Sequence, residues 1–141
     1  MNANELKYED IAVGNTYQFE HRITKAQVGV FAQLTGDVNP LHVDEEFASK
    51  SSYGKNLVHG MLAGSLFSRL IGMYCPGRDA LYLRQTLDFK GPIFCDDVVT
   101  VKGTVISKVD SVKMIELKTE ILKQGEVVLT GTAKAKMVDN E

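Results

Sequence analysis

The chain of 141 residues lacks most features that mark exported, membrane-spanning or zinc-binding proteins. Its only cysteines, Cys75 and Cys95, form no CxxC pair, so we expect two free thiols in a reducing compartment rather than a zinc site. No run of about 18 apolar residues is present, which argues against a membrane span. The polar start, Met1–Glu5, has no apolar core typical of a signal peptide. These absences together predict a cytoplasmic protein.

A large excess of one charge is also lacking. Lysine and arginine total 16 and aspartate and glutamate total 18, which gives a net charge of −2. This balance provides no bulk attraction to nucleic acid or to an anionic membrane. Apolar residues make up 44% of the chain. With no repeat, low-complexity tract or linker, the length predicts a single domain over residues 1–141 with one sizeable core.

The loose alternation of residues 17–23 predicts one strand near the start of the chain. After this strand, helical signals dominate the first half of the chain. Thr24 is a suitable N-cap for a helix over residues 25–36, where apolar residues recur at helical spacing. Gly36 is expected to end that helix. Residues 44–51 suit a short exposed helix with an acidic start.

Residues 60–74 are apolar on almost every face and carry small residues between the large ones, a pattern typical of a buried helix. The period then changes to two, which is the signature of strands. We expect four strands in meander order, over residues 81–89, 98–109, 114–122 and 127–138. The fold class is therefore α+β, with an antiparallel five-stranded sheet wrapped around a buried central helix.

The candidate catalytic side chains lie in the segment 37–42 (DVNPLH), which places a carboxylate and an imidazole five residues apart. In a regular helix or strand, this spacing points the two side chains in different directions. Pro40 disfavours both, because it lacks an N–H and pushes Asn39 out of the helical region. We expect a bent loop that brings Asp37 and His42 together. Such a pair can hold a water molecule and move its protons, which suggests an enzyme that handles water at a carbonyl-activated substrate.

Three segments, in their order along the chain, resemble the MaoC-like hydratases of the hot-dog fold, in particular the (R)-specific enoyl-CoA hydratases. They are GDVNPLH at 36–42, VHGML at 58–62 with the serines that follow it, and LRQTLDFKGPIFCDDV at 83–98. The resemblance implies hydration of trans-2-enoyl-CoA to (R)-3-hydroxyacyl-CoA. It also implies a homodimer and no metal or organic cofactor, since the coenzyme A is part of the acyl thioester substrate.

The resemblance also suggests individual roles. It assigns Asp37 and His42 to a catalytic dyad, Gly60 to a backbone N–H that faces the thioester oxygen, Asn39 to shaping the loop, and Ser68 to a polar position near the dyad. The role of Gly60 has independent support. It has no side chain to obstruct a ligand, and it opens a predicted helix, where free N–H groups and the positive end of the dipole converge.

Several alternatives stay open at this stage. His59 precedes the predicted central helix, and we favour a structural role in which its ring orients the loop. Ile71 is expected in the core, with contact to an acyl chain as the alternative. Hot-dog thioesterases generally carry a carboxylate on the central helix, whereas residues 60–72 contain no Asp or Glu, which counts against hydrolysis. A dehydratase of acyl-carrier-protein substrates and a non-catalytic thioester-binding module are the remaining candidates.

Overall fold

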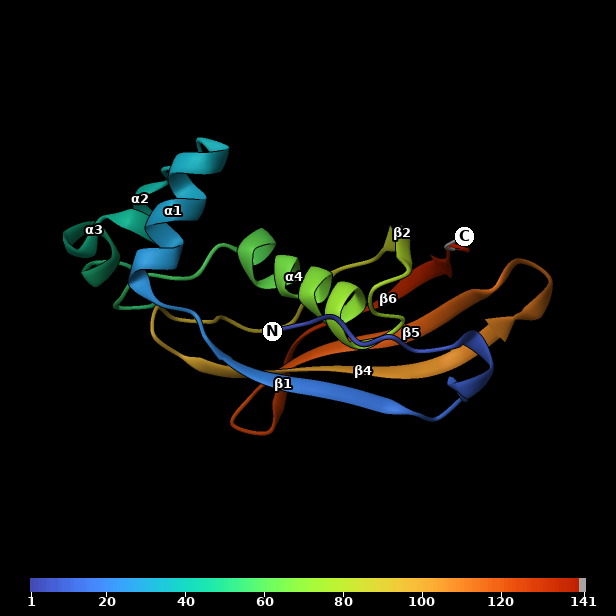
Figure 1. The fold of residues 1–141 in the computed structure, drawn as a ribbon. Helices are drawn as coiled ribbons and strands as arrows, with labels where there is room; N and C mark the ends of the chain where they lie inside the picture. The colour runs from blue at the N-terminus through green and yellow to red at the C-terminus, as the bar shows by residue number, and fades with distance from the viewer. Residues whose placement is uncertain (140–141) are drawn as a thin grey trace.

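The computed structural model describes residues 1–139 and shows one antiparallel sheet that curves around helix α4, Gly60–Arg69 (Figure 1). The predicted arrangement of a sheet wrapped around a central helix is therefore confirmed. From one edge to the other, the sheet contains β1 (Thr16–Arg22), β4 (Val98–Val109), β5 (Met114–Lys123), β6 (Glu126–Met137) and β2 (Ala80–Gln85). A sixth strand of two residues, β3 (Asp88–Phe89), also pairs with β6.

The strand order corrects the meander that the sequence predicted. Strands β4, β5 and β6 do follow one another as hairpins, but β2 pairs with β6 rather than with β4. The predicted strand over residues 81–89 is also divided into β2 and β3. Alternation identifies segments that lie in a sheet but not the partner of each segment, which depends on contacts between residues far apart in sequence. As a result, β1 and β2 form the two edges.

Helix α1, Lys25–Thr35, begins and ends where its capping residues predict. The Thr24 hydroxyl accepts a hydrogen bond from the Gln27 N–H, and the Gln27 side chain accepts one from the Thr24 N–H, which together form a capping box. Gly36 follows with a φ of 80°, in the left-handed region that favours glycine. These local contacts fix the point at which the chain leaves α1 and Asp37 begins the candidate segment.

The segment after α1 differs from the bent loop that the sequence predicted, because Pro40–Val43 forms a single helical turn, α2. Proline is well tolerated at the first position of a helix, where its missing N–H is not needed. Asn39 stays extended, with a ψ of 130°, and its side chain accepts a hydrogen bond from the Leu41 N–H. The bend therefore lies at Asn39. A second short helix, α3 (Glu45–Ser49), follows, and α1–α3 project beyond one end of the sheet (Figure 1).

Helix α4 continues into a π-helical turn, Leu70–Tyr74, so the two elements together span the predicted helix. Phe67 and Leu70 are fully buried against the sheet. A Cβ at Gly103 in β4 would lie 2.9 Å from a Leu70 methyl carbon, so this glycine allows the helix to approach the sheet closely. Within residues 1–139, no helix is both long and apolar enough to cross a membrane.

The expectation that the central helix is buried on all sides is wrong for one face. Met61 is 61% exposed, and Ser65 and Ser68 are exposed as well. The apolar pattern of the segment does not distinguish a face that packs on the sheet from one that borders an open groove.

Candidate active site

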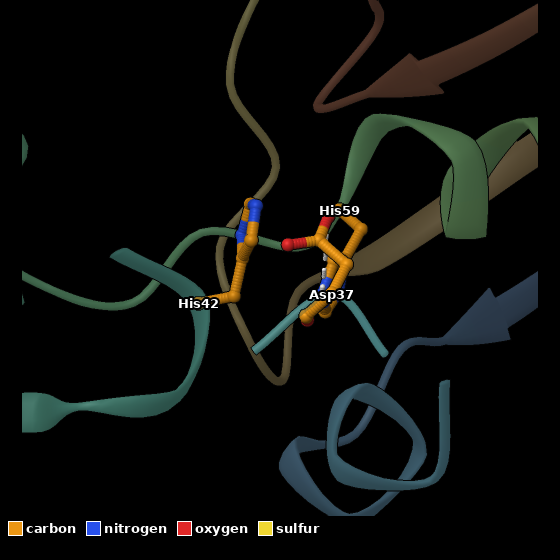
Figure 2. Close-up of side chains that lie close together, drawn as sticks. All are labelled: Asp37, His42 and His59. Carbon is orange, nitrogen blue, oxygen red and sulfur yellow. Dashed lines mark hydrogen bonds and ion pairs between the residues drawn. The ribbon is translucent and has the colours of Figure 1, made fainter. Parts of the chain in front are cut away.

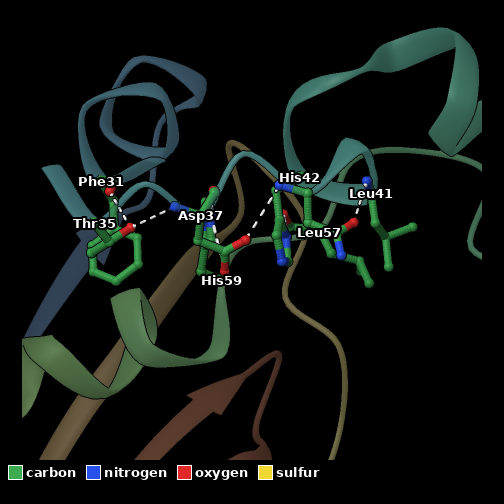
Figure 3. A network of polar contacts seen from close by, with 8 residues as sticks. Phe31, Thr35, Asp37, Leu41, His42, Leu57 and His59 are labelled. Carbon is green, nitrogen blue, oxygen red and sulfur yellow. Dashed lines mark hydrogen bonds and ion pairs between the residues drawn. The ribbon is translucent and has the colours of Figure 1, made fainter. Parts of the chain in front are cut away.

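Asp37 stands directly after α1, and its backbone is held from both sides (Figure 3). Its N–H donates to the Thr35 hydroxyl oxygen at 3.2 Å, and that hydroxyl donates in turn to the Phe31 carbonyl at 2.8 Å. One carboxylate oxygen accepts a hydrogen bond from the Asn39 N–H at 3.3 Å. The Asp37 side chain remains 51% exposed. It is therefore a fixed carboxylate that solvent or a ligand can reach.

The half-buried His42 is positioned by a single strong contact, from its Nδ1 to the Leu57 carbonyl oxygen at 2.8 Å (Figure 3). A carbonyl oxygen can only accept, so Nδ1 carries the hydrogen of this bond. In the neutral ring, Nε2 then has a free lone pair that can accept a proton. Leu57 contributes only its backbone here, so no sequence pattern could have identified it.

His59 lies beneath these residues and is only 2% exposed. Its Nε2 is 2.9 Å from the Asp37 carbonyl oxygen and 3.9 Å from one Asp37 carboxylate oxygen. Its ring stacks on that of His42, with centroids 3.9 Å apart and an angle of 27° between the planes. This position agrees with the interpretation that His59 orients the segment through its ring.

The structure thus brings together the side chains of Asp37, His42 and His59, and one carboxylate oxygen of Asp37 points toward the His42 ring (Figure 2). One ligand atom of each residue lies within 4.8 Å of the other two. Asp37 and His42 form no direct hydrogen bond with each other. Because hydrogen bonds to water span about 2.8 Å, a separation of this size suits one water molecule that contacts both groups.

The same three side chains are of the types that bind transition metals, but the orientation of the rings disfavours a shared ion. Two imidazoles that bind one metal direct their nitrogen lone pairs toward a common point. The rings of His42 and His59 are instead stacked face to face. The cluster is therefore better suited to proton transfer than to metal binding.

Gly60 begins α4 one residue after His59, and the start of the helix has no side-chain cap. Within the described residues 1–139, the Gly60 N–H has no hydrogen-bond partner. A Cβ at Gly60 would lie 2.8 Å from the Phe89 ring, so the aromatic ring shields one side of the glycine. The sequence pointed to Gly60 but not to Phe89, because Phe89 is distant in sequence and lies on a different element, β3, which pairs with β6. The helix start can therefore receive an oxygen atom that carries negative charge.

A groove of about 430 Å³ runs between α1, the exposed face of α4 and β2. Its polar end is formed by Tyr82, whose hydroxyl donates to the Gln85 side-chain oxygen, and partial burial raises the pKa of Tyr82 to about 12. The Gln85 amide donates in turn to the hydroxyl of the buried Thr119 at 2.9 Å. The residues that line the groove are Phe31, Met61, Gly64, Ser65, Ser68, Tyr82, Gln85 and Leu87.

Two further predicted residues, Ser68 and Ile71, differ in whether they line this groove. Ser68 lines it, two turns along α4 from Gly60. Ile71 does not, because it is only 1% exposed and packs in the part of the core that contains Ile115 and Leu117. Its contact with an acyl chain stays a prediction. The Phe31 ring also connects the groove with the cluster, since it lies 4.9 Å from the His59 ring.

Comparison with known proteins identifies the family of this chain. The family model described as "MaoC like domain" matches residues 10–127. The (R)-specific enoyl-CoA hydratase of Aeromonas caviae is 38% identical over 133 residues, which cover 94% of this chain and 99% of that protein. The 3-hydroxybutyryl-CoA dehydratase of Methylorubrum extorquens is 35% identical over 96% of this chain and 87% of its own length.

Solved structures give the same result for the fold. The structure of the (R)-hydratase from A. caviae superposes with a TM-score of 0.89, over 92% of this chain and 99% of that one. The chain therefore belongs to the MaoC-like dehydratase family and has the hot-dog fold.

Proposed function

We propose that the protein is a hydro-lyase that adds water to trans-2-enoyl-CoA and forms (R)-3-hydroxyacyl-CoA. The observation that carries this proposal is the position of Asp37 and His42 next to the uncapped start of α4 at Gly60. Names of family members support the substrate class, since two relatives similar over nearly their full length are named as an enoyl-CoA hydratase and a 3-hydroxybutyryl-CoA dehydratase. Hydration and dehydration are the two directions of one reaction.

In the proposed reaction, Asp37 and His42 hold the attacking water. The Asp37 carboxylate and the Nε2 lone pair of His42 can each accept a hydrogen bond from this water, which directs its oxygen toward C3 of the enoyl group. As the C–O bond forms, one of the two residues takes a proton, and a proton is returned to C2. Addition of both groups from one side makes the reaction syn. General acid–base steps of this kind contribute about 10²–10⁴ each to the rate.

Negative charge develops on the thioester oxygen during attack, and the Gly60 N–H is the proposed donor to that oxygen. The positive end of the α4 dipole adds to this stabilisation. A single donor of this type typically contributes about 10²–10³ to the rate. We propose that the acyl tail then lies in the groove beside α4, whose lining extends from Met61, the residue after Gly60, to Tyr82 and Gln85.

The proposal is tested with crotonyl-CoA, by following the ultraviolet absorbance of the conjugated thioester together with the release of free thiol. Loss of the absorbance without thiol release, and an (R)-3-hydroxybutyryl product on chiral analysis, are the expected results. Thiol release would indicate a thioesterase instead. Saturable binding without turnover would indicate a binding module. Activity only with the acyl-carrier-protein thioester would show that the substrate is carried by that protein rather than by coenzyme A.

We also propose that two copies associate through β2, which stands at the sheet edge. Leu81 and Leu83 on this strand are 49% and 51% exposed, and an exposed apolar edge strand is a favourable surface for pairing with another strand. Light scattering should give a mass of about twice 15.6 kDa, and Leu83→Lys should shift it toward that of one chain. A wild-type mass of a single chain at micromolar concentration would contradict this proposal.

A further inference from the structure

His59 occupies a position that the proposed reaction does not use directly, since it is buried behind both Asp37 and His42. It contacts the first through a hydrogen bond and the second through ring stacking. A displacement of His59 would therefore alter one contact to each of these two residues. This arrangement raises the question of which of its two contacts matters for the reaction.

The hydrogen-bond geometry determines which ring nitrogen of each histidine carries a proton. His59 Nε2 faces the Asp37 carbonyl oxygen, which can only accept, so Nε2 carries the hydrogen. Its Nδ1 is buried and has no partner within residues 1–139. For His42 the pattern is reversed, because Nδ1 donates to Leu57. The stacked rings therefore hold opposite tautomers.

We propose that His59 is a positioning residue, in the Nε2–H tautomer, whose hydrogen bond to the Asp37 carbonyl holds the carboxylate at the distance from His42 that one water molecule requires. This inference rests on the proposed hydration. The buried ring cannot reach the substrate, and it acts through the backbone of Asp37. Its stacking on His42 has the smaller effect, because the hydrogen bond from His42 to Leu57 already fixes that ring.

Two substitutions separate the hydrogen bond from the ring. In His59→Gln, the side-chain amide places a donor close to the original Nε2 but removes the aromatic face. In His59→Phe, the ring and its stacking are kept and the donor is lost. His21→Gln is the matched control, because His21 lies on β1 outside the cluster and its Nε2 contacts Gln27.

The expected result is a difference in kcat between the two variants of His59. His59→Phe should lower kcat for crotonyl-CoA by about 30–100-fold, because small displacements of a reacting group have effects of this size. His59→Gln should lose no more than about fivefold, and KM should stay within about threefold in both variants, because His59 does not touch the substrate. The control should match the wild type.

A kcat of His59→Phe within about threefold of the wild type would overturn the proposal. Equal losses in both variants would show that a donor at this position is not enough for activity, and a loss confined to His59→Gln would assign the effect to the ring; either result would also overturn the proposal. A rise in KM without loss of kcat would indicate direct substrate contact, with the same consequence. Thermal melting of each variant verifies that it is folded.

A second measurement does not depend on activity. Long-range ¹H–¹⁵N correlation spectra distinguish protonated from unprotonated ring nitrogens, and His21→Gln identifies the third histidine. The expected pattern is a proton on Nε2 and not on Nδ1 for His59, with the reverse for His42. A proton on Nδ1 of His59 would refute the assignment. If the wild type fails to hydrate any enoyl-CoA, the proposed function is wrong, while the spectra still decide the tautomer.

Discussion

Gly60→Ala provides a direct test of the proposed oxyanion site, because it changes the space around the N–H and leaves the N–H itself in place. The new Cβ would lie 2.8 Å from Cε1 of Phe89 and 3.1 Å from two further ring atoms. Such distances force the ring to move. Because Phe89 is 53% exposed, its ring can shift outward at a cost of about 1 kcal/mol or less. Replacing glycine in a helix offsets much of this cost, so stability should hardly change.

Activity should respond differently from stability. The added methyl group and the displaced ring lie beside the N–H, where the thioester oxygen must approach to about 2.9 Å. Complete loss of one donor typically costs about 10²–10³ in rate. Since the N–H remains but the approach is obstructed, we expect kcat/KM for crotonyl-CoA to fall by about 10–100-fold, which corresponds to about 1.4–2.7 kcal/mol.

Gly29→Ala is the matched control for this experiment. Gly29 lies in the interior of α1, and a Cβ at this position would have no atom within 4 Å. The substitution should stabilise the protein by about 0.5–1 kcal/mol, seen as a rise in melting temperature, and leave the rate unchanged. A folded Gly60→Ala protein with kcat/KM within twofold of the wild type would refute the role assigned to Gly60.

Four further outcomes are expected. In crotonyl-CoA assays, Asp37→Asn should lower kcat by about 10²–10⁴ with little change in melting temperature. The control variant Asp44→Asn, at the exposed cap of α3, should keep full activity. Thr24→Ala should reduce the free energy of unfolding by about 1 kcal/mol in urea titrations, through loss of the capping box. Burial raises the pKa of Cys75 to about 11, so at pH 8 only about one in a thousand of these thiols is ionised; alkylation followed by mass spectrometry should find Cys75 protected until the protein unfolds. In Gly64→Ala, the new Cβ would lie 3.0 Å from Leu87 in the groove. This variant should reduce kcat/KM for octenoyl-CoA about tenfold more than for crotonyl-CoA. Equal effects on the two substrates would place the acyl tail elsewhere.

Features that depend on local chemistry were predictable from sequence. Thr24 and Gly36 fixed both ends of α1, since a cap needs only its own residue and the first turn of the helix. The alternating segment 98–109 coincides with β4 for the same reason, because its period is a property of the segment alone. Asn39 lies outside the helical region, as the proline after it predicted, but the turn that follows is helical rather than part of a bent loop.

Features that depend on distant residues were not predictable in this way. The pairing of β2 with β6 and the stacking of His59 on His42 both join segments that no local pattern connects. The family resemblance identified Asp37, His42 and Gly60 as a set, but it gave no contact between them. Two contacts became visible only in the structure. Leu57 contacts His42 through its backbone carbonyl, which no side-chain pattern reveals. The Phe89 ring lies beside Gly60, although the two residues are far apart in sequence.

The contacts around the site explain why its parts form one unit. Segments 37–44 and 56–59 hold each other through hydrogen bonds to backbone carbonyls: the Leu57 N–H and the Asn56 amide donate to Leu41, and the two histidine rings donate to Leu57 and Asp37. Gly60 follows the second segment directly. The groups proposed to hold the water, Asp37 and His42, and the proposed donor to the oxyanion at Gly60 are therefore fixed relative to one another in the protein alone. In the proposed reaction, groups fixed in this way would need little reorganisation, so their electrostatic stabilisation would be available to the transition state.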